Sequence, residues 1–195
     1  MPANGYGDQT GEQPVIPNKD RDRAVSVILE ILRQAGSAGL GRIQLYKAFW
    51  LAHLFYAKDN PGYLTDWPIV RMPRGPGINM GTILLRELEN AGKLKQTTEY
   101  VGPFQEFRCR SVATATNPQM SADEVEAIRQ AYEFVKGKTA TELSEYSHEY
   151  SRSWREMADG SELDIYNDLI QDDDEYNERK DALDAAMKAT EDVFR

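Results

Sequence analysis

The segment GRIQLYKAFWLAHLFYAKD, residues 41–59, is the most apolar stretch of the chain. At helical spacing its apolar residues cover most of the helix surface. One stripe is formed by Ile43, Tyr46, Trp50, Leu54 and Ala57. Much of the remaining surface is covered by Leu45, Phe49, Leu51 and Phe55. A helix that is apolar on most of its faces is buried on most of its faces. The sequence therefore predicts that the rest of the fold is built around this helix, which ends before Pro61 and Gly62.

Helical periodicity predicts two further helices in the first half of the chain. A helix over about residues 20–35 ends at Gly36 and has an apolar stripe made of Val25, Ile28, Leu32 and Ala35. The segment INMGTILLRELENAGKL, residues 78–94, predicts a helix that ends near Gly92, where a C-terminal glycine belongs. Its inner face is expected to contain Ile83, Leu84 and Leu88.

Capping boxes predict three helices in the second half. They begin at Ser121 with Glu124, at Thr139 with Glu142, and at Ser161 with Asp164. If no turn breaks it, the second of these helices is expected to present one continuous apolar face, formed by Leu143, Tyr146, Tyr150, Trp154 and Met157.

Two stretches lack helical periodicity. Residues 66–81, DWPIVRMPRGPGINMG, are predicted to form a rigid connection between helices, and LKQTTEYVGPFQEFRCRS, residues 94–111, is predicted to form two strands around Gly102-Pro103. A helix followed by a hairpin is the outline of a winged helix-turn-helix. We therefore expect a mostly α fold: a single compact helical domain with a small β-hairpin, which is the winged-helix-like element, and an acidic C-terminal helix.

Composition limits the class of protein. The chain has 195 residues, one cysteine and two histidines, with 41% apolar and 28% charged residues. This is the composition of a soluble domain with one core. The sequence contains no run of about 18 apolar residues, so no membrane span is predicted. Residues 1–18 are expected to be a flexible leader without a secretory signal. A cytoplasmic protein without a metal, a cofactor or an internal disulfide is expected.

Charge divides the chain into unlike halves. Residues 1–120 have 14 Lys and Arg against 11 Asp and Glu, whereas residues 121–195 have 9 against 21. An acidic half repels nucleic acid and attracts basic partners. The alternative is that the acidic residues only solvate exposed helix faces.

The stretch 66–81 is not a phosphate-binding loop. PRGPGINMG has glycines, but no GK[ST] follows it, and its prolines lack the N–H groups that a phosphate would need. A rigid connection explains the prolines and leaves Arg71 and Arg74 without a role. Exposed arginines on a rigid backbone lose little entropy on binding, so they are candidates for a protein contact.

No catalytic constellation is predicted. His53 lies on the apolar helix and is interpreted as a core histidine, while His148 lies near Ser144 and Ser151 on one helix, where a triad is not normally assembled. Arginines on either side of Cys109 could lower its pKa, but a packed strand cysteine is the preferred interpretation. We therefore predict that the chain is not an enzyme.

DNA binding is a second hypothesis. Residues 42–110, which include the predicted winged-helix element, contain ten Lys and Arg against six Asp and Glu. The third helix offers Asn79, Arg86, Asn90 and Lys93, diluted by Glu87 and Glu89. An acidic second half would oppose binding unless it faced away from the duplex.

Three segments in order, LYKAFWLAHLFYAKD, DWPIVRMPRGPG and ATELSEYSHEYSRSWREM, resemble the Panacea domain of the SocA-like antitoxin family. That family has a KLLYFAH-type helix, a proline segment with a later Gly-Pro, and an ELSxxTHxxxxW helix. The counterparts are residues 45–53, Pro68 with Gly75-Pro76, and residues 143–154. Departures are Arg74-Gly75-Pro76-Gly77 in place of Tyr-Gly-Pro-Val, a longer hairpin, and Ser147 in place of threonine.

The resemblance covers about residues 20–170 and places an antitoxin domain at 19–170, before an acidic helix or tail at 171–195. It implies a bacterial or phage antitoxin of a toxin–antitoxin system, which neutralises a toxin protein by direct binding. The expected partner-binding residues are Arg71, Arg74, Gly75, Pro76, His148 and Trp154. The alternatives are a winged-helix DNA-binding regulator and a proteolytic adaptor that delivers a toxin to a cellular protease through the acidic tail.

Overall fold

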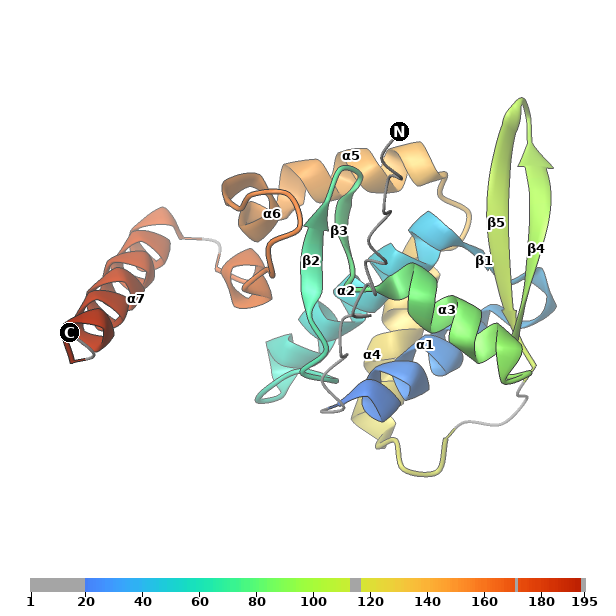
Figure 1. The fold of residues 1–195 in the computed structure, drawn as a ribbon, viewed down its shortest axis with the longest axis horizontal. Helices are drawn as coiled ribbons and strands as arrows, with labels where there is room; N and C mark the ends of the chain where they lie inside the picture. The colour runs from blue at the N-terminus through green and yellow to red at the C-terminus, as the bar shows by residue number, and fades with distance from the viewer. Residues whose placement is uncertain (1–19, 113–116, 171, 194–195) are drawn as a thin grey trace, which may run out of the picture.

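A computed structural model describes residues 20–112, 117–170 and 172–193. The described chain is mostly helical, with two small antiparallel sheets (Figure 1). Its elements in chain order are α1 (Arg21–Ala35), η1 (Gly36–Ala38), β1 (Leu40–Gly41), α2 (Arg42–Asp59), β2 (Ile69–Met72), β3 (Gly75–Ile78), α3 (Gly81–Asn90), β4 (Leu94–Val101), β5 (Phe104–Ser111), α4 (Ala122–Val135), α5 (Ala140–Tyr150), α6 (Arg152–Glu156), η2 (Ile165–Asp168) and α7 (Asp173–Val193).

Helix α2 is the centre of the fold, as its sequence predicts. Every residue from Leu45 to Leu54 is buried, and the helix packs against α1, α4, α5 and β3. Trp50 and Phe49 are among the largest fully buried side chains. Two polar residues, Lys47 and His53, are buried within this run, which makes them exceptional. None of the described helices is long and apolar enough to cross a membrane.

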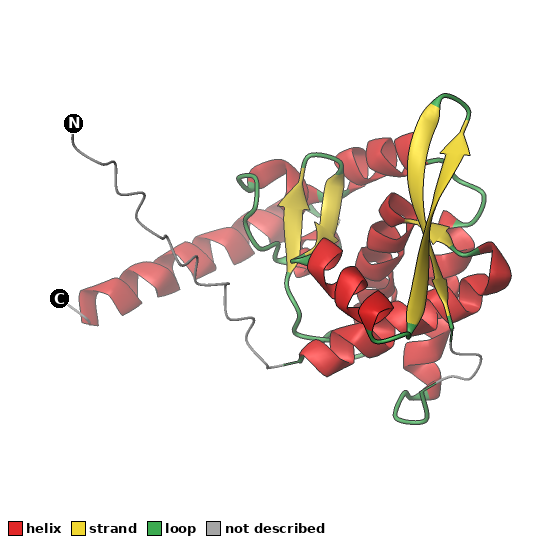
Figure 2. Ribbon diagram, turned by 45° about the vertical axis from the view of Figure 1, so that its right-hand side comes forward, coloured by secondary structure: helices red, strands yellow, loops and turns green. Residues whose placement is uncertain are grey.

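Strands β4 and β5 form the predicted hairpin around Gly102. Strand β5 also pairs with the two-residue strand β1, where Leu40 lies opposite Cys109, so the sheet order is β1-β5-β4. Both ribbon views show the hairpin extending beyond the helices at its turn end (Figure 2). At that end Tyr100 and Phe107 are exposed, and the guanidinium of Arg42 lies 4.5 Å from the Phe107 ring centroid.

The sequence predicts only a rigid connection between helices at residues 66–81. The structure shows that this stretch contains a second hairpin. Strands β2 and β3 pair antiparallel, with Ile69 opposite Ile78 and Met72 opposite Gly75. The other edge of β2 pairs with residues 160–163: the Arg71 N–H donates to the Ser161 carbonyl at 2.8 Å, and the Leu163 N–H to the Ile69 carbonyl at 2.8 Å. Proline and glycine mask this hairpin in the sequence, since they are depleted in strands.

Two predictions in the second half are wrong. The expected continuous face from Leu143 to Met157 is broken at Ser151, whose side chain accepts the Trp154 N–H and begins α6. Tyr150 and Met157 are consequently exposed. Ser161 does not begin a helix, because residues 160–163 are extended along β2; Asp164 instead caps η2.

Other local predictions are confirmed. The capping boxes at Ser121 and Thr139 are present, and Gly92 follows α3 with a φ of +68°. In α3, however, Leu85 is fully buried and Ile83 is only half-buried. The leader 1–18 lies outside the described residues.

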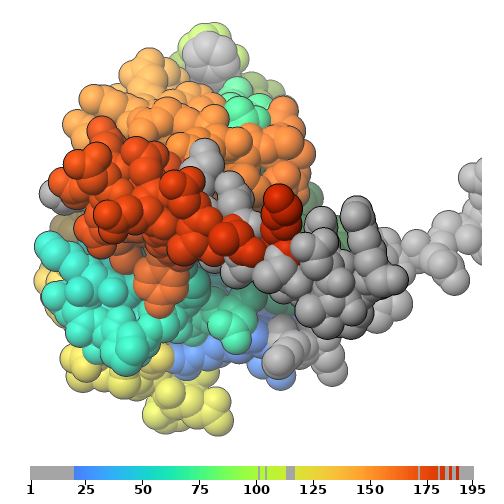
Figure 3. Space-filling model, turned by 90° about the vertical axis from the view of Figure 1, so that its left-hand side faces the viewer, coloured from blue at the N-terminus to red at the C-terminus, as the bar shows by residue number. Residues whose placement is uncertain are grey.

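The chain after α6 packs over one face of the molecule. Figure 3 shows residues from about 160 onward, in orange-red, between the teal segment that follows α2 and the orange helices α5 and α6. Helix α7 then extends away from the body (Figure 1). Its first two turns attach it: Arg152 pairs with Asp173 at 2.6 Å, Arg179 with Asp164 at 2.8 Å, and Tyr176 is buried.

The Asp168 carboxylate, in η2, connects the chain after α6 to helices α2 and α6. It accepts hydrogen bonds from the Trp50 indole at 3.1 Å, the Ser151 hydroxyl at 2.9 Å, and the Ser153 N–H at 2.8 Å and hydroxyl at 3.1 Å. Burial nevertheless raises the pKa of this carboxyl above its ordinary value. The network fixes the start of α6 against the central helix.

Replacing Asp168 by alanine leaves these donors without their acceptor, so we expect a loss of about 3 kcal/mol in the free energy of unfolding. Urea unfolding measures it. Glu133→Ala, which removes an exposed carboxylate paired with Lys136, is the matched control and should cost under about 1 kcal/mol. Equal losses for the two variants would contradict the role given to the network.

Candidate functional site

Three segments that are distant in the sequence meet at the turn between β2 and β3. Helix α2 contributes Lys47, the hairpin contributes Arg71 to Pro76, and α5 and α6 contribute Ser147, His148 and Trp154. We call this cluster the hairpin corner and define it as Lys47, Arg71, Arg74, Gly75, Pro76, Ser147, His148 and Trp154.

Trp154 is held in one orientation by four contacts. Its indole N–H donates to the Met72 carbonyl at 2.8 Å, and its own carbonyl accepts the Arg71 Nε–H at 2.8 Å. The His148 ring stacks on it with centroids 3.9 Å apart and an angle of 11°. The Arg71 guanidinium lies 4.4 Å from the ring centroid, a cation–π distance. A half-buried aromatic that is already ordered loses little entropy when a partner packs on it.

Lys47 places an amino group inside the protein behind this surface. Its side chain is 2% exposed, and its Nζ donates to the Pro76 carbonyl at 2.9 Å. Burial lowers the pKa of this lysine to about 7. The pKa of His148 is also lowered, first by burial and then by the positive charges of Lys47 and Arg71. The cationic forms of Lys47 and His148 are therefore disfavoured, and the guanidinium groups of Arg71 and Arg74 are the positive charges of the hairpin corner.

Gly75 is needed where the hairpin meets α2 and α5. Its φ is +97°, and a Cβ at this position would lie 2.1 Å from Ser147 Oγ and 2.4 Å from Lys47 Nζ. Both the backbone conformation and the space exclude a larger residue. The Ser147 hydroxyl is buried and donates to the Ser144 carbonyl at 2.9 Å, so its role is packing and hydrogen bonding.

The hairpin corner contains all six expected partner-binding residues, but not in equal exposure. Arg74 is exposed. The expectation that Arg71 is also exposed is wrong: its side chain is 21% exposed and pairs with Asp159. Gly75 and Pro76 are buried, and His148 and Trp154 are half-buried against each other.

Lys47 and Ser147 are the members that sequence reasoning missed. A lysine within the run LYKAFWLAH was the available signal, because lysine is almost never fully buried without a partner. Its importance becomes clear only when the hairpin is placed beside α2.

The other candidate residues have structural surroundings. His53 is 1% exposed, in agreement with a core histidine. Cys109 is also buried, in agreement with a packed strand cysteine, and burial raises the pKa of its thiol to about 11, which outweighs the lowering by Arg42 and Arg110. Among residues 20–112, 117–170 and 172–193, no cluster of His, Cys, Asp and Glu is arranged to hold a metal ion.

The pKa of Lys47 predicts a pH dependence of stability. Between pH about 7 and 10.5 the unfolded state binds more protons at this site than the folded state, so stability rises with pH across that window. The slope due to this group is at most about 1.4 kcal/mol per pH unit. Urea unfolding of wild type and Lys47→Met across the window should give curves that diverge; parallel curves would contradict a neutral buried amine.

Gly75→Ala should destabilise the protein by about 2 kcal/mol or more, because it combines a positive φ with two close contacts. Gly62→Ala is the control: its φ is +84° and nothing lies within 4 Å of the added Cβ. It should show the backbone strain alone. Urea unfolding that finds equal costs would exclude a packing role for Gly75.

Comparison with known proteins identifies a family for the chain. No curated protein and no solved structure matches the chain. A protein-family model described as antitoxin SocA-like, Panacea domain, matches residues 45–155, which is more than half of the chain. The match includes the three segments that meet at the hairpin corner. The resemblance seen in the sequence is confirmed, and the chain belongs to the SocA-like antitoxin, Panacea domain family.

Proposed function

We propose that this protein is an antitoxin of a toxin–antitoxin system that silences a toxin by binding it directly, without catalysis. Family membership supports the antitoxin role. The observation that carries the choice of surface is the convergence of the family's three segments on the hairpin corner. There, exposed Arg74 lies in the turn after Arg71, which contacts a pre-ordered Trp154.

Charge supports a toxin with a basic surface. The acidic half of the chain includes α7, whose first turn contains Asp173, Asp174 and Glu175. The exposed Arg74 at the hairpin corner and an acidic helix on one molecule would orient a partner that has both kinds of charge.

Capture of a partner tests the proposal. Tagged full-length protein is purified from its own host at moderate salt with nuclease present. One small protein at near-equal stoichiometry, whose expression alone is toxic and whose toxicity ends on co-expression, is the expected result. Recovery of nucleic acid without a protein partner when nuclease is omitted would overturn it in favour of a DNA-binding regulator.

The hairpin β4–β5 gives the DNA hypothesis little support. Arg108 pairs with Glu99 at 2.8 Å and with Glu106 at 2.7 Å, and Arg110 pairs with Glu99 at 2.6 Å. Cations that are already paired release fewer counterions on meeting phosphate, which is the main source of affinity for DNA.

A proteolytic adaptor is the second candidate, and the extension of α7 away from the body favours it (Figures 1 and 2). Among the described residues the contacts of α7 with the body lie in its first turns, and the part that extends from the body would be a docking element for a protease component. Deleting residues 171–195 distinguishes the two functions, since an adaptor would still bind the toxin but would no longer promote its degradation.

The double variant Arg71→Ala/Arg74→Ala should weaken toxin binding by about 1–3 kcal/mol, in the range of hot-spot truncations. Arg74→Ala alone should keep the melting temperature of the wild type, because this side chain is exposed. Arg129→Ala on α4, which removes an exposed arginine paired with Glu126, is the control and should leave binding unchanged. Calorimetric titration measures the affinity of the double variant and of the control, and thermal unfolding measures the melting temperature of Arg74→Ala. Unchanged binding by the double variant would show that the corner is scaffold only.

A further inference from the structure

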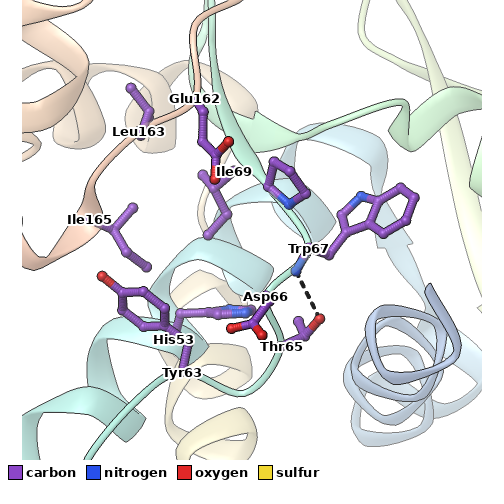
Figure 4. Close-up of a pocket in the computed structure, with 10 residues that line it drawn as sticks. His53, Tyr63, Thr65, Asp66, Trp67, Ile69, Glu162, Leu163 and Ile165 are labelled. Carbon is purple, nitrogen blue, oxygen red and sulfur yellow. Dashed lines mark hydrogen bonds between the residues drawn. The ribbon is translucent and has the colours of Figure 1, made fainter. Parts of the chain in front are cut away.

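A hollow of about 160 Å³ lies where the loop before β2 meets α2 and the chain that precedes η2 (Figure 4). Buried His53, Trp67 and Ile69 form its inner part, and exposed Asp66 and Glu162 lie at its rim. The volume is several times the ~30 Å³ share of one water molecule and below the ~300 Å³ of a pocket for a drug-sized ligand. It therefore suits a group the size of one side-chain end.

The inner part of this hollow offers a hydrogen-bond acceptor. His53 Nδ1 lies 2.7 Å from the Phe49 carbonyl oxygen, which can only accept, so Nδ1 carries the proton. Burial lowers the pKa of His53 to about 4, so the ring is neutral at pH 7 and Nε2 has a free lone pair. Among the described residues the buried Nε2 has no partner in hydrogen-bond geometry; the backbone carbonyls of Phe49 and Thr65 both raise the pKa of the ring, and burial outweighs them.

The rim offers carboxylates that no cation neutralises. Among residues 20–112, 117–170 and 172–193, neither Asp66 nor Glu162 forms an ion pair. The Asp20 carboxylate lies beside them, because it accepts the Asp66 N–H. Arg23 is close, but its Nε–H donates to the Leu64 carbonyl and its charge is paired with Glu124. The rim is thus a negative site without a counter-charge.

The aromatic residues of the hollow present rings and no free N–H. The Trp67 indole N–H donates to the Asn79 carbonyl at 2.9 Å. Tyr63 stacks on Tyr166 with centroids 4.3 Å apart, and its buried hydroxyl has no hydrogen-bond partner among the described residues. Acceptors, carboxylates and aromatic faces together favour a group that only donates hydrogen bonds and has a positive charge.

We propose that this hollow, the acid pocket formed around His53, Tyr63, Asp66, Trp67 and Glu162, receives the ammonium or guanidinium end of one lysine or arginine side chain of the bound toxin. The chemistry of the pocket stands on its own residues, and the assignment of the cation to a toxin rests on the proposed function.

Strand β2 connects the acid pocket to the hairpin corner. Ile69 at its start lines the pocket, and Arg71 and Met72 near its end contact Trp154. Four residues of strand extend over about 10 Å, well within the span of a standard protein interface of ~800 Å² per partner. One toxin molecule can therefore contact both, through an anchoring cation in the pocket and a second surface at the corner.

Small cations test the chemistry of the pocket without a toxin. Ethylguanidinium and n-butylammonium are titrated into the full-length protein, and the Trp67 indole and Asp66 backbone resonances are followed by ¹H–¹⁵N NMR. Saturable shifts are expected with both cations and not with n-butanol, and they should be lost in Asp66→Asn/Glu162→Gln. Absent shifts, equal shifts with butanol, or shifts kept by the double variant would overturn the proposal.

The toxin recovered by capture tests the assignment of the cation. At low ionic strength Asp66→Asn/Glu162→Gln should weaken toxin binding roughly tenfold, because the rim no longer attracts the positive charge of the toxin. The control Asp123→Asn/Glu133→Gln removes two exposed charges from α4 and should leave affinity unchanged. Equal affinity of the two double variants would overturn the toxin assignment. Failure of the wild type to capture any toxin would overturn the proposed function, and the cation titration would still decide the nature of the pocket.

Discussion

A helix that is buried all round is the constraint on which this structure depends. Helix α2 has ten consecutive buried residues, so it must be enclosed by other elements on every side. Helices α1, α4 and α5 and the strand β3 supply that enclosure. Of its two buried polar residues, Lys47 donates to Pro76 outside the helix and His53 donates to Phe49 within it. Lys47 lies at the hairpin corner and His53 lines the acid pocket.

Local signals were sufficient for much of the helical part. Apolar periodicity gave α1 and α2, and the capping boxes at Ser121 and Thr139 gave α4 and α5, because a cap depends on residues within one turn. The break at Ser151 and the extended path of residues 160–163 depend on tertiary partners, Asp168 and strand β2, that periodicity does not contain. For the candidate site, the motif residues were found from sequence, but the partial covering of Arg71 and the burial of Lys47 required the three-dimensional arrangement.

The glycine and proline of the hairpin corner act through their backbone atoms, and the side-chain contacts come from other residues. Pro76 has no N–H to place in a ladder, but its carbonyl is the acceptor for the Lys47 amino group. Gly75 lets the backbone approach Ser147 and Lys47 closely, and the side chains of Trp154 and Arg71 then lie over the hairpin. Residues that would weaken an ordinary strand are here the condition for close contact between three segments.

The pairing of β2 with residues 160–163 has a consequence for biosynthesis. The β2–β3 hairpin is complete early in translation, but its outer strand emerges only after α3, the long hairpin, α4, α5 and α6 have been made. At ordinary elongation rates this interval is on the order of seconds. During that time the outer edge of β2 has unpaired N–H and C=O groups, which are a template for strand addition by another chain. The nascent protein is therefore exposed to edge-to-edge aggregation until residues 160–163 are synthesised, and a chaperone that binds extended strands would find its substrate here.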